Sequence, residues 1–320
     1  RTAPRTEHFM GEGLMKQSQV VNMRHRLWHL LNGTGPDVRF DSFAEVSCRQ
    51  VNGARLSKLE FHGSHGETVP AYFLHPTRSD APAVLYCHAH GARYDIGMEE
   101  FVAGRPALVR PYLEDFVALG WGALCVEMPT FGQRQSPNES QLSKIHLWRG
   151  TTLFGQMLAE LVAGIDYLSQ HPDVNADRIA TLGISMGGTH AWWLSALDPR
   201  VFAAVSMCCF SDLGHLIETH AHDDHGHYMT VPGLLKLTTT GRLAGLAAPR
   251  AQLHCIGEND GFTPKDGFER ACRDLQACYA AAPDHVALFP AHEVGHQETE
   301  EMRECVLEFL TARLSANPSK

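Results

Sequence analysis

The stretch that decides the fold is Arg178-Ile-Ala-Thr-Leu-Gly-Ile-Ser-Met-Gly-Gly-Thr-His190. Its apolar run over 179–182 is typical of a short buried strand, and helical spacing resumes over 189–197. Between them, Gly183-Ile-Ser-Met-Gly187 has the Gly-x-Ser-x-Gly pattern of a sharp strand-to-helix turn that lifts a serine clear of a sheet. The serine needs that position because a base must reach its proton while the substrate approaches. The stretch therefore predicts Ser185 as a nucleophile, although the pattern alone also fits a glycine-rich turn with a chance serine.

The composition is that of an ordinary globular chain of 320 residues, 44% hydrophobic and 20% charged. This length suits one α/β domain with extensions, or two small domains. The net charge of −9 argues against a surface for nucleic acid or for an anionic membrane. Nine cysteines without a CxxC pair favour a reduced, cytoplasmic protein. The chain does not start with Met, so the earlier removal of a signal segment is left as an alternative.

The N-terminal part is expected to differ from the rest of the chain. Residues 1–10 carry no periodic pattern and are expected to be unstructured, whereas the apolar spacing over 16–31 predicts a helix. Strand-like runs over 42–51, 54–61 and 69–74, separated by turn residues, predict an antiparallel meander. We therefore expect a helical extension over 1–40 and a main domain over 41–320.

From residue 83 onward, strands and helices alternate. Strands are predicted over 83–87, 121–128, 179–182, 203–210, 251–256 and 285–289, and helices over 106–119, 151–170, 189–197, 265–281 and 298–314. Residues 135–147 look polar and irregular, and residues 211–248 form a long, His-rich excursion. Alternation with near-continuous apolar strands predicts an α/β fold, in which a parallel sheet is covered on both faces.

An acid and a histidine should follow the nucleophile in that order, each in a loop after a later strand. Asp260 follows the strand that ends at residue 256, and His296 follows the strand that ends at residue 289. We assign Asp260 as the carboxylate that orients the imidazole, and His296 as the general base and later general acid. Either residue alone would be read as a turn or surface residue. The ordered trio is what carries the hypothesis.

Several residues compete for these roles. Asp212, Glu258 and Asp266 are rival acids, because the first follows an earlier strand and the other two flank Asp260. His292 is a rival base, four residues before His296. We prefer His296 because the preceding glycine allows a sharp backbone turn and because the last helix begins there.

The developing oxyanion needs two backbone donors. One should be the amide of Met186, directly after the nucleophile. The other should come from the loop after the strand at 83–87, with His90 as first choice and Ala89 or Ala92 as alternatives. The side chains of His88 and His90 are expected to be structural, because no carboxylate or cysteine lies beside them at metal-ligand spacing.

Taken together, His88-Ala-His-Gly91, Asp177-Arg-Ile179, Gly183-Ile-Ser-Met-Gly-Gly188, the Gly-x-x-Asp-x-x-x-Pro run over 257–264 and Gly295-His296 resemble the α/β-hydrolase superfamily. The branch that they resemble holds acetyl-xylan-esterase-like and dienelactone-hydrolase-like proteins. The resemblance spans about 68–315 and implies an eight-stranded, mostly parallel sheet and hydrolysis of carboxylic esters. Dienelactone hydrolases proper carry a cysteine nucleophile, so Ser185 favours a plain serine esterase. Glu127 stands where relatives often have Asp, and a structural role is expected for it.

The excursion over 211–248 lies where this superfamily inserts a lid. Its imidazoles at His215, His220, His222, His225 and His227 could in principle bind a transition metal. We prefer pocket-lining residues and no metal, because a loop offers no clear rigid frame for ligands. His225, His227 and Tyr228 are accordingly expected to contact the substrate. Trp192 and Trp193 are expected in the core.

The sequence thus predicts a serine esterase that forms an acyl-enzyme on a small-molecule ester, with no cofactor, no nucleic acid and no membrane partner. A homo-oligomer is compatible with it. A serine peptidase or acyltransferase on the same fold is the alternative within enzymes. A non-catalytic metal- or ligand-binding relative that uses the His-rich loop is the alternative outside them.

Overall fold

The computed structural model describes residues 16–315, so the expectation for residues 1–10 lies outside it. Within this range the chain forms one nine-stranded sheet in the order β1-β2-β3-β5-β4-β6-β7-β8-β9. The strands are β1 (Phe40–Val51), β2 (Ala54–Gly63), β3 (Thr68–Leu74), β4 (Ala81–Cys87), β5 (Gly122–Val126), β6 (Val174–Ile184), β7 (Val201–Met207), β8 (Ala251–Gly257) and β9 (Val286–Ala291). The pairs from β1 to β5 are antiparallel, and the pairs from β5 through β4 to β9 are parallel. The predicted α/β fold with a mostly parallel sheet is confirmed.

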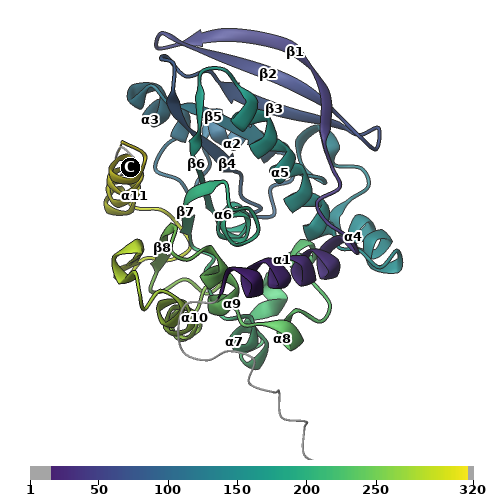
Figure 1. Ribbon diagram of the computed structural model, residues 1–320, viewed down its shortest axis with the longest axis vertical. Helices are drawn as coiled ribbons and strands as arrows, with labels where there is room; N and C mark the ends of the chain where they lie inside the picture. Colours follow the sequence, from purple (N-terminus) through teal and green to yellow (C-terminus); the bar gives the residue numbers. More distant parts are fainter. Residues whose placement is uncertain (1–15, 316–320) are drawn as a thin grey trace, which may run out of the picture.

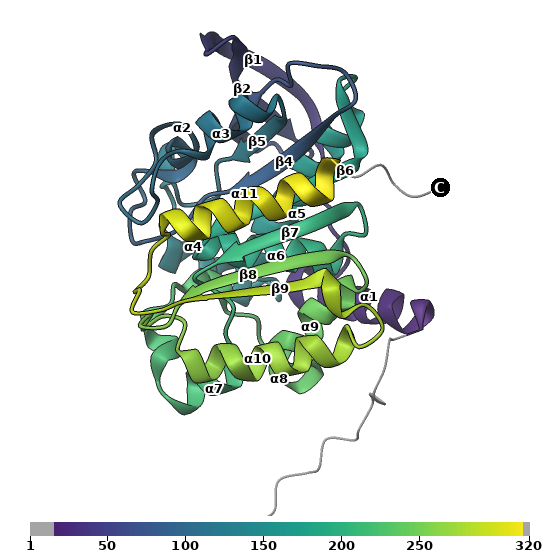
Figure 2. The same ribbon diagram turned by 90° about the vertical axis from the view of Figure 1, so that its left-hand side faces the viewer.

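Helices cover both faces of the sheet (Figures 1 and 2). They are α1 (Gln17–Asn32), α2 (Glu100–Ala103), α3 (Tyr112–Leu119), α4 (Glu139–Trp148), α5 (Leu153–Gln170), α6 (Met186–Leu197), α7 (Leu213–Glu218), α8 (Leu234–Leu237), α9 (Thr240–Ala244), α10 (Lys265–Cys278) and α11 (Glu300–Ser315). One hydrophobic cluster includes residues of α1, α5 and α6, and a second includes residues of α3 and α11. The sheet therefore has a core on each side.

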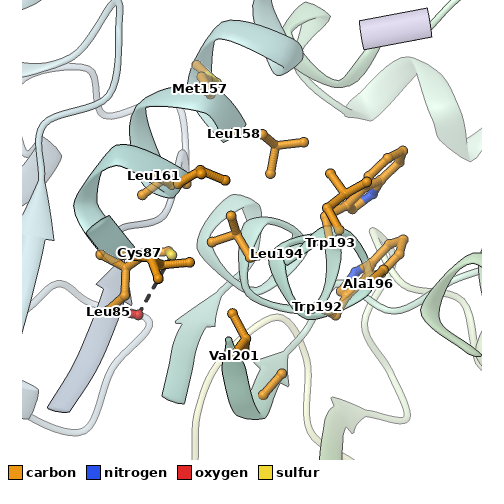
Figure 3. Close-up of a cluster of buried hydrophobic side chains, with 14 of the residues drawn as sticks. Leu85, Cys87, Met157, Leu158, Leu161, Trp192, Trp193, Leu194, Ala196 and Val201 are labelled. Carbon is orange, nitrogen blue, oxygen red and sulfur yellow. Dashed lines mark hydrogen bonds between the residues drawn. The ribbon is translucent and has the colours of Figure 1, made fainter. Parts of the chain in front are cut away.

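The alternation of side chains along β4 shows how the strands serve both cores. Leu85 and Cys87 belong to the cluster with α5 and α6, while Val84 and Tyr86 belong to the cluster with α3 and α11. Figure 3 shows Leu85 and Cys87 beside α5 and α6 in that first cluster. Burying each large apolar side chain contributes about 1.5–3 kcal/mol, so both layers stabilise the strand.

Trp192 and Trp193 lie in the core, as expected. Their exposed fractions are 4% and 3%, and both project from α6 in the cluster drawn in Figure 3. The ring of Trp193 meets Phe154 of α5 edge-on at 5.1 Å between centroids. These rings therefore anchor the helix that follows Ser185.

Two expectations about the fold need correction. The sheet has nine strands where eight were expected, because the whole N-terminal meander pairs into the same sheet through β3 and β5. Residues 135–147 were expected to be irregular, but most of them lie in α4, which spans Glu139–Trp148. The helix starts with a reciprocal cap, in which Gln141 N–H donates to the Asn138 side chain at 3.0 Å and Asn138 N–H donates to the Gln141 side chain at 3.1 Å. Its buried positions are polar and most of its apolar side chains are exposed, so the apolar residues did not mark the face that packs on the domain.

The helix expected over 106–119 begins later, at Tyr112. Pro111 stands at its N-cap with extended backbone (φ −60°, ψ 140°), so the preceding residues form turns. Proline disfavours helical backbone in the residue before it, which explains the late start.

The N-terminal helix is docked against the domain. Thr152 N–H donates to Leu31 O at 2.8 Å, and Asn32 Nδ2 donates to Gly155 O at 3.2 Å. A Cβ on Gly155 would lie 2.5 Å from Leu31 O, so only glycine permits this approach of α1 to α5. The extension predicted over 1–40 is thus packed on the domain in its described part, and its boundary at residue 40 remains a prediction.

Nine cysteines lie within residues 16–315 and none of them forms a disulfide there. In the same range, no helix has both the length and the hydropathy to cross a bilayer.

Candidate active site

The turn around Ser185 has the geometry expected of the elbow. Ser185 joins β6 to α6 with φ 57° and ψ −123°, a backbone region that a residue with a Cβ rarely occupies. Its N–H donates to Met207 O at 2.8 Å, and its carbonyl accepts from Thr189 N–H at 2.9 Å. These contacts with β7 and α6 hold the strained turn, and the serine side chain is left half-buried.

Glycines make this turn sterically feasible. A Cβ on Gly187 would lie 1.9 Å from Cys87 O, and a Cβ on Gly183 would lie 2.4 Å from the carbonyl carbon of Gly187. Both distances are far shorter than any real contact, so α6 can start directly behind β4 and β6 only if these positions are glycine.

The three residues assigned from the order of the loops come together in space. His296 Nε2 lies 3.0 Å from Ser185 Oγ, and His296 Nδ1 lies 2.8 Å from Asp260 Oδ2. The Asp260 side chain is fully buried, while that of His296 is 23% exposed. The imidazole therefore bridges a buried carboxylate and a hydroxyl that faces outward.

The loops that carry the acid and the histidine are bonded to each other. Asn259 N–H donates to Val294 O at 2.8 Å, and Glu258 N–H donates to Ala291 O at 2.9 Å. A Cβ on Gly257 would lie 2.3 Å from the carbonyls of both Val294 and Gly295, so glycine is required at the end of β8. Asp260 Oδ1 also accepts from Phe262 N–H at 2.9 Å, which leaves Oδ2 for the imidazole.

The rival acids have other partners. Asp212 is buried at the start of α7, where it accepts from His215 N–H at 3.0 Å and lies 3.2 Å from Arg270 Nε. Asp266 lies in the first turn of α10. Glu258 pairs with Lys265 at 2.6 Å, and its other oxygen lies 2.9 Å from Nδ1 of the rival base, His292. The His292 side chain is 82% exposed and is bonded to Glu258, whereas His296 is the histidine bonded to Ser185.

The backbone donors near Ser185 can be distinguished by their hydrogen bonds. Ala89 N–H donates to Glu100 Oε2 at 3.0 Å, and Ala92 N–H donates to His90 Nδ1 at 3.0 Å. Within residues 16–315, the amides of His90 and Met186 have no such partner in the chain. Of the three alternatives in the loop after β4, His90 is therefore the one with a free amide.

Glu127 and His88 form a buried structural contact below this loop. Glu127 Oε1 accepts from Met98 N–H at 2.9 Å, and His88 Nε2 accepts from Met128 N–H at 3.1 Å. Gly97 and Gly132, both with positive φ, leave the room that the Glu127 carboxyl occupies. Burial raises the pKa of Glu127 to about 7 and lowers the pKa of His88 to about 3.

Glu139 was missed in the sequence, because it lies at the start of the unpredicted α4. Its side chain is 3% exposed, and Oε2 accepts from His90 Nε2 at 2.6 Å and from Tyr94 Oη at 2.8 Å. Oε1 accepts from Tyr228 N–H at 2.9 Å. The only signal in the sequence was its position directly after the N-cap residue Asn138, and an acidic residue there is common and does not name these partners.

The three residues predicted to contact a substrate are placed differently. Tyr228 is buried, and its ring stacks on His90 at 5.7 Å between centroids. His225 is half-buried, and its Nε2 lies 3.0 Å from Phe262 O, with the Phe262 ring 4.8 Å from that of His296. His227 is exposed. Tyr228 and His225 thus lie near the candidate site, while His227 has no contact that ties it there.

Cavities within residues 16–315 also bear on the site. A small one of about 20 Å³ lies between α6 and the segment 211–248, with Thr189, Cys209 and His225 in its lining. A much larger groove of about 1030 Å³ lies between β1, β2 and α5, away from Ser185. Size alone would select the wrong place for the chemistry.

Within residues 16–315, one group of three possible metal ligands comes together. It consists of Cys208, Asp260 and His296, whose ligand atoms lie within 4.8 Å of one another. Two of them already bond to each other, and burial raises the pKa of the Cys208 thiol, which keeps it protonated. The histidines of the 211–248 segment form no group of three in the described chain.

The sequence is similar to those of known proteins. A model of the prolyl oligopeptidase family matches residues 152–230, which include the turn at Ser185. The chain is 35% identical over 294 residues to "Putative hydrolase YtaP" of Bacillus subtilis (strain 168), and the match covers 90% of this chain and 97% of that protein.

Among solved structures, Acetyl Xylan Esterase 1 from Thermoanaerobacterium sp. JW/SL YS485 has a TM-score of 0.64 at 17% identity, covering 94% of this chain and 95% of that one. Glucuronoyl Esterase from Solibacter usitatus has a TM-score of 0.64 at 15% identity, covering 93% of this chain and 92% of that one. These two likenesses concern the fold. The chain has the α/β-hydrolase fold and belongs to the family of the YtaP protein.

Proposed function

We propose that this protein is a serine hydrolase that cleaves carboxylic esters of small molecules through an acyl-enzyme. The observation that carries the proposal is the continuous hydrogen-bonded chain from Ser185 Oγ through His296 to the buried Asp260, built on a strained strand-to-helix turn. This constellation is known to activate a serine hydroxyl on several unrelated folds.

In the proposed reaction, Ser185 Oγ attacks the ester carbonyl while His296 Nε2 accepts its proton. Asp260 holds the imidazole in the tautomer that leaves Nε2 free, and it stabilises the cation that forms. The amides of Met186 and His90 donate to the oxyanion. His296 then protonates the departing alcohol, which leaves the acyl group on Ser185. Water attacks this acyl-enzyme while His296 accepts its proton, and His296 returns that proton to Ser185 Oγ as the carboxylic acid leaves.

An ester is preferred as substrate over a peptide. The fold-level likenesses are to an acetyl xylan esterase and a glucuronoyl esterase, and these names supply an analogy for the substrate class only. A serine peptidase is the alternative, since the matching family model is that of prolyl oligopeptidases. Residues 16–80 hold one helix and three strands of the main sheet, so this described part contains no propeller domain of the kind expected of such peptidases.

The test is intact-mass labelling with a fluorophosphonate, followed by a p-nitrophenyl ester series from acetate to octanoate and an aminoacyl p-nitroanilide. We expect one adduct on the wild-type protein, none on Ser185→Ala, and ester turnover far above amide turnover. A folded protein that gives no adduct would overturn the proposal. Faster cleavage of the anilide than of any ester would favour the peptidase.

A further inference from the structure

Glu139 joins three segments that are distant in sequence. Its carboxylate, on α4, bonds His90 in the loop after β4, Tyr94 further along that loop, and the backbone of Tyr228 in the 211–248 segment. Burial by itself would raise the pKa of Glu139, but the hydrogen bonds from His90, Tyr94 and Tyr228 outweigh it and lower that pKa. The carboxylate is therefore charged, buried and fully engaged.

The hydrogen bonds of His90 define its protonation. Its Nδ1 accepts from Ala92 N–H at 3.0 Å, so that nitrogen carries no proton. The proton must then be on Nε2, which donates to Glu139 at 2.6 Å. Glu139 thus selects the neutral tautomer whose other nitrogen holds the backbone of Ala92.

The turn after His90 needs this support. Gly91 and Ala92 both have φ of 53°, and for Ala92 the left-handed backbone is strained. His90 O accepts from Arg105 at 3.2 Å, so the residue is held through its carbonyl and through both ring nitrogens. These contacts set the direction of the His90 amide, which the proposed reaction uses for the oxyanion.

We infer that Glu139 is a positioning residue for the proposed ester hydrolysis. It aims the amide of His90 at the oxyanion and ties that loop to Tyr228. The inference rests on the proposed function, because it assigns a role within that reaction. The inference assigns a role to a residue of α4, a helix that supplies none of the reacting groups and neither of the oxyanion donors.

The test compares Glu139→Gln with wild type on p-nitrophenyl acetate. Glutamine keeps the shape but loses the charge and one acceptor. Because removing an oxyanion donor outright costs 10²–10³ in kcat, a misaimed donor should cost about tenfold. KM should stay within about twofold of wild type, because the contact acts in the transition state.

The Ki of a trifluoromethyl ketone inhibitor is a second measurement, and a purely structural role of Glu139 would leave it unchanged. The inhibitor adds to the serine and forms a tetrahedral oxyanion, so its Ki should rise by about the same tenfold factor as kcat falls. His90→Ala removes the other half of the same hydrogen bond and keeps the backbone amide. Its effect should resemble that of Glu139→Gln, and the double variant should be scarcely worse than either single one.

Glu160→Gln is the matched control. Glu160 is also a buried carboxylate, but it pairs with Arg134 and bonds Gln156. This variant should lower the melting temperature and leave kcat and Ki unchanged. Where Glu139→Gln does not fold, His90→Ala carries the same comparison.

Wild-type kcat and Ki in folded Glu139→Gln would overturn the positioning role, and so would fully additive losses in the double variant. In both cases the proposed function would still stand, provided that the wild-type protein hydrolyses esters and is labelled at Ser185. If the wild-type protein neither labels nor hydrolyses any ester, the proposed function fails and the positioning role fails with it.

Discussion

The two sides of the candidate site are built in different ways. On one side, Ser185 directly follows strand β6 of the parallel sheet, and Asp260 and His296 lie in the loops after β8 and β9. On the other, His90 lies on a loop, Glu139 at the start of α4, and Tyr228 in a single 3-10 turn over His227–Met229. The strand side is positioned by backbone ladders, whereas the loop side depends on buried side-chain hydrogen bonds. Substitutions of Ser185, Asp260 or His296 should therefore nearly abolish turnover, whereas substitutions on the loop side should only lower it.

The largest effect is expected for Ser185→Ala. Removing the nucleophile should lower kcat/KM by about 10⁴ or more, because what remains is the contribution of the oxyanion donors and binding. Steady-state hydrolysis of p-nitrophenyl acetate and intact-mass labelling measure this. A variant that retains more than a tenth of wild-type activity would show that another group carries out the reaction.

Asp260→Asn should come next, with a loss of about 10³–10⁴ in kcat, because the amide favours the wrong imidazole tautomer. Asp212→Asn is its matched control, since Asp212 is equally buried but caps α7 and faces Arg270. That control should lose stability and retain kcat within about twofold. Equal losses of kcat in the two variants would contradict the assignment of the acid.

Acidification should destabilise the folded domain, and with it both sides of the candidate site. Burial lowers the pKa of His88, His190 and His254 to about 3 each. These imidazoles are neutral in the folded state, while the unfolded chain binds protons as the pH falls through about 6.5. The free energy of unfolding should therefore fall between pH 6.5 and 3, by up to about 1.4 kcal/mol per pH unit for each imidazole.

His190→Leu isolates one of these three groups. Both His190 ring nitrogens lack a hydrogen-bond partner within the described chain, and the ring stacks on Phe154 at 5.3 Å. Unfolding of the variant should take up one proton fewer, so its free energy of unfolding should depend less steeply on pH. The variant should therefore gain stability relative to wild type as the pH falls. Urea unfolding at pH 5, 6 and 7 measures the slopes, and parallel curves for the two proteins would contradict this explanation.

The smallest effects are expected within the 211–248 segment. Tyr228→Ala removes the ring that stacks on His90 and should lower kcat/KM by about fivefold, in line with about 1 kcal/mol for an aromatic contact. His227→Ala should change it by less than about twofold, because an exposed side chain without partners contributes little. If the order of the two effects is reversed, His227 contacts the substrate and the sequence hypothesis for it holds.

The strand side could be predicted because its signals are local. The pattern around Gly183 and Gly187 demands a tight turn, and each later strand ends in a loop that holds an acid or a histidine. The loop side gave no comparable signal. Glu139 lies 49 residues from His90 and 89 from Tyr228, and the buried positions of its helix are polar, so no apolar period marks that face.

By itself, the sequence determined the elbow, the alternation of strands and helices, and the order of nucleophile, acid and base. These follow from backbone sterics and from hydrophobic periodicity, which act over a few residues. Only the tertiary structure shows that Asp260 and His296, and not the rivals Asp212 and His292, are hydrogen-bonded in line with Ser185. Those bonds span 36 and 111 residues, so they exist only once the sheet has brought the strand ends together.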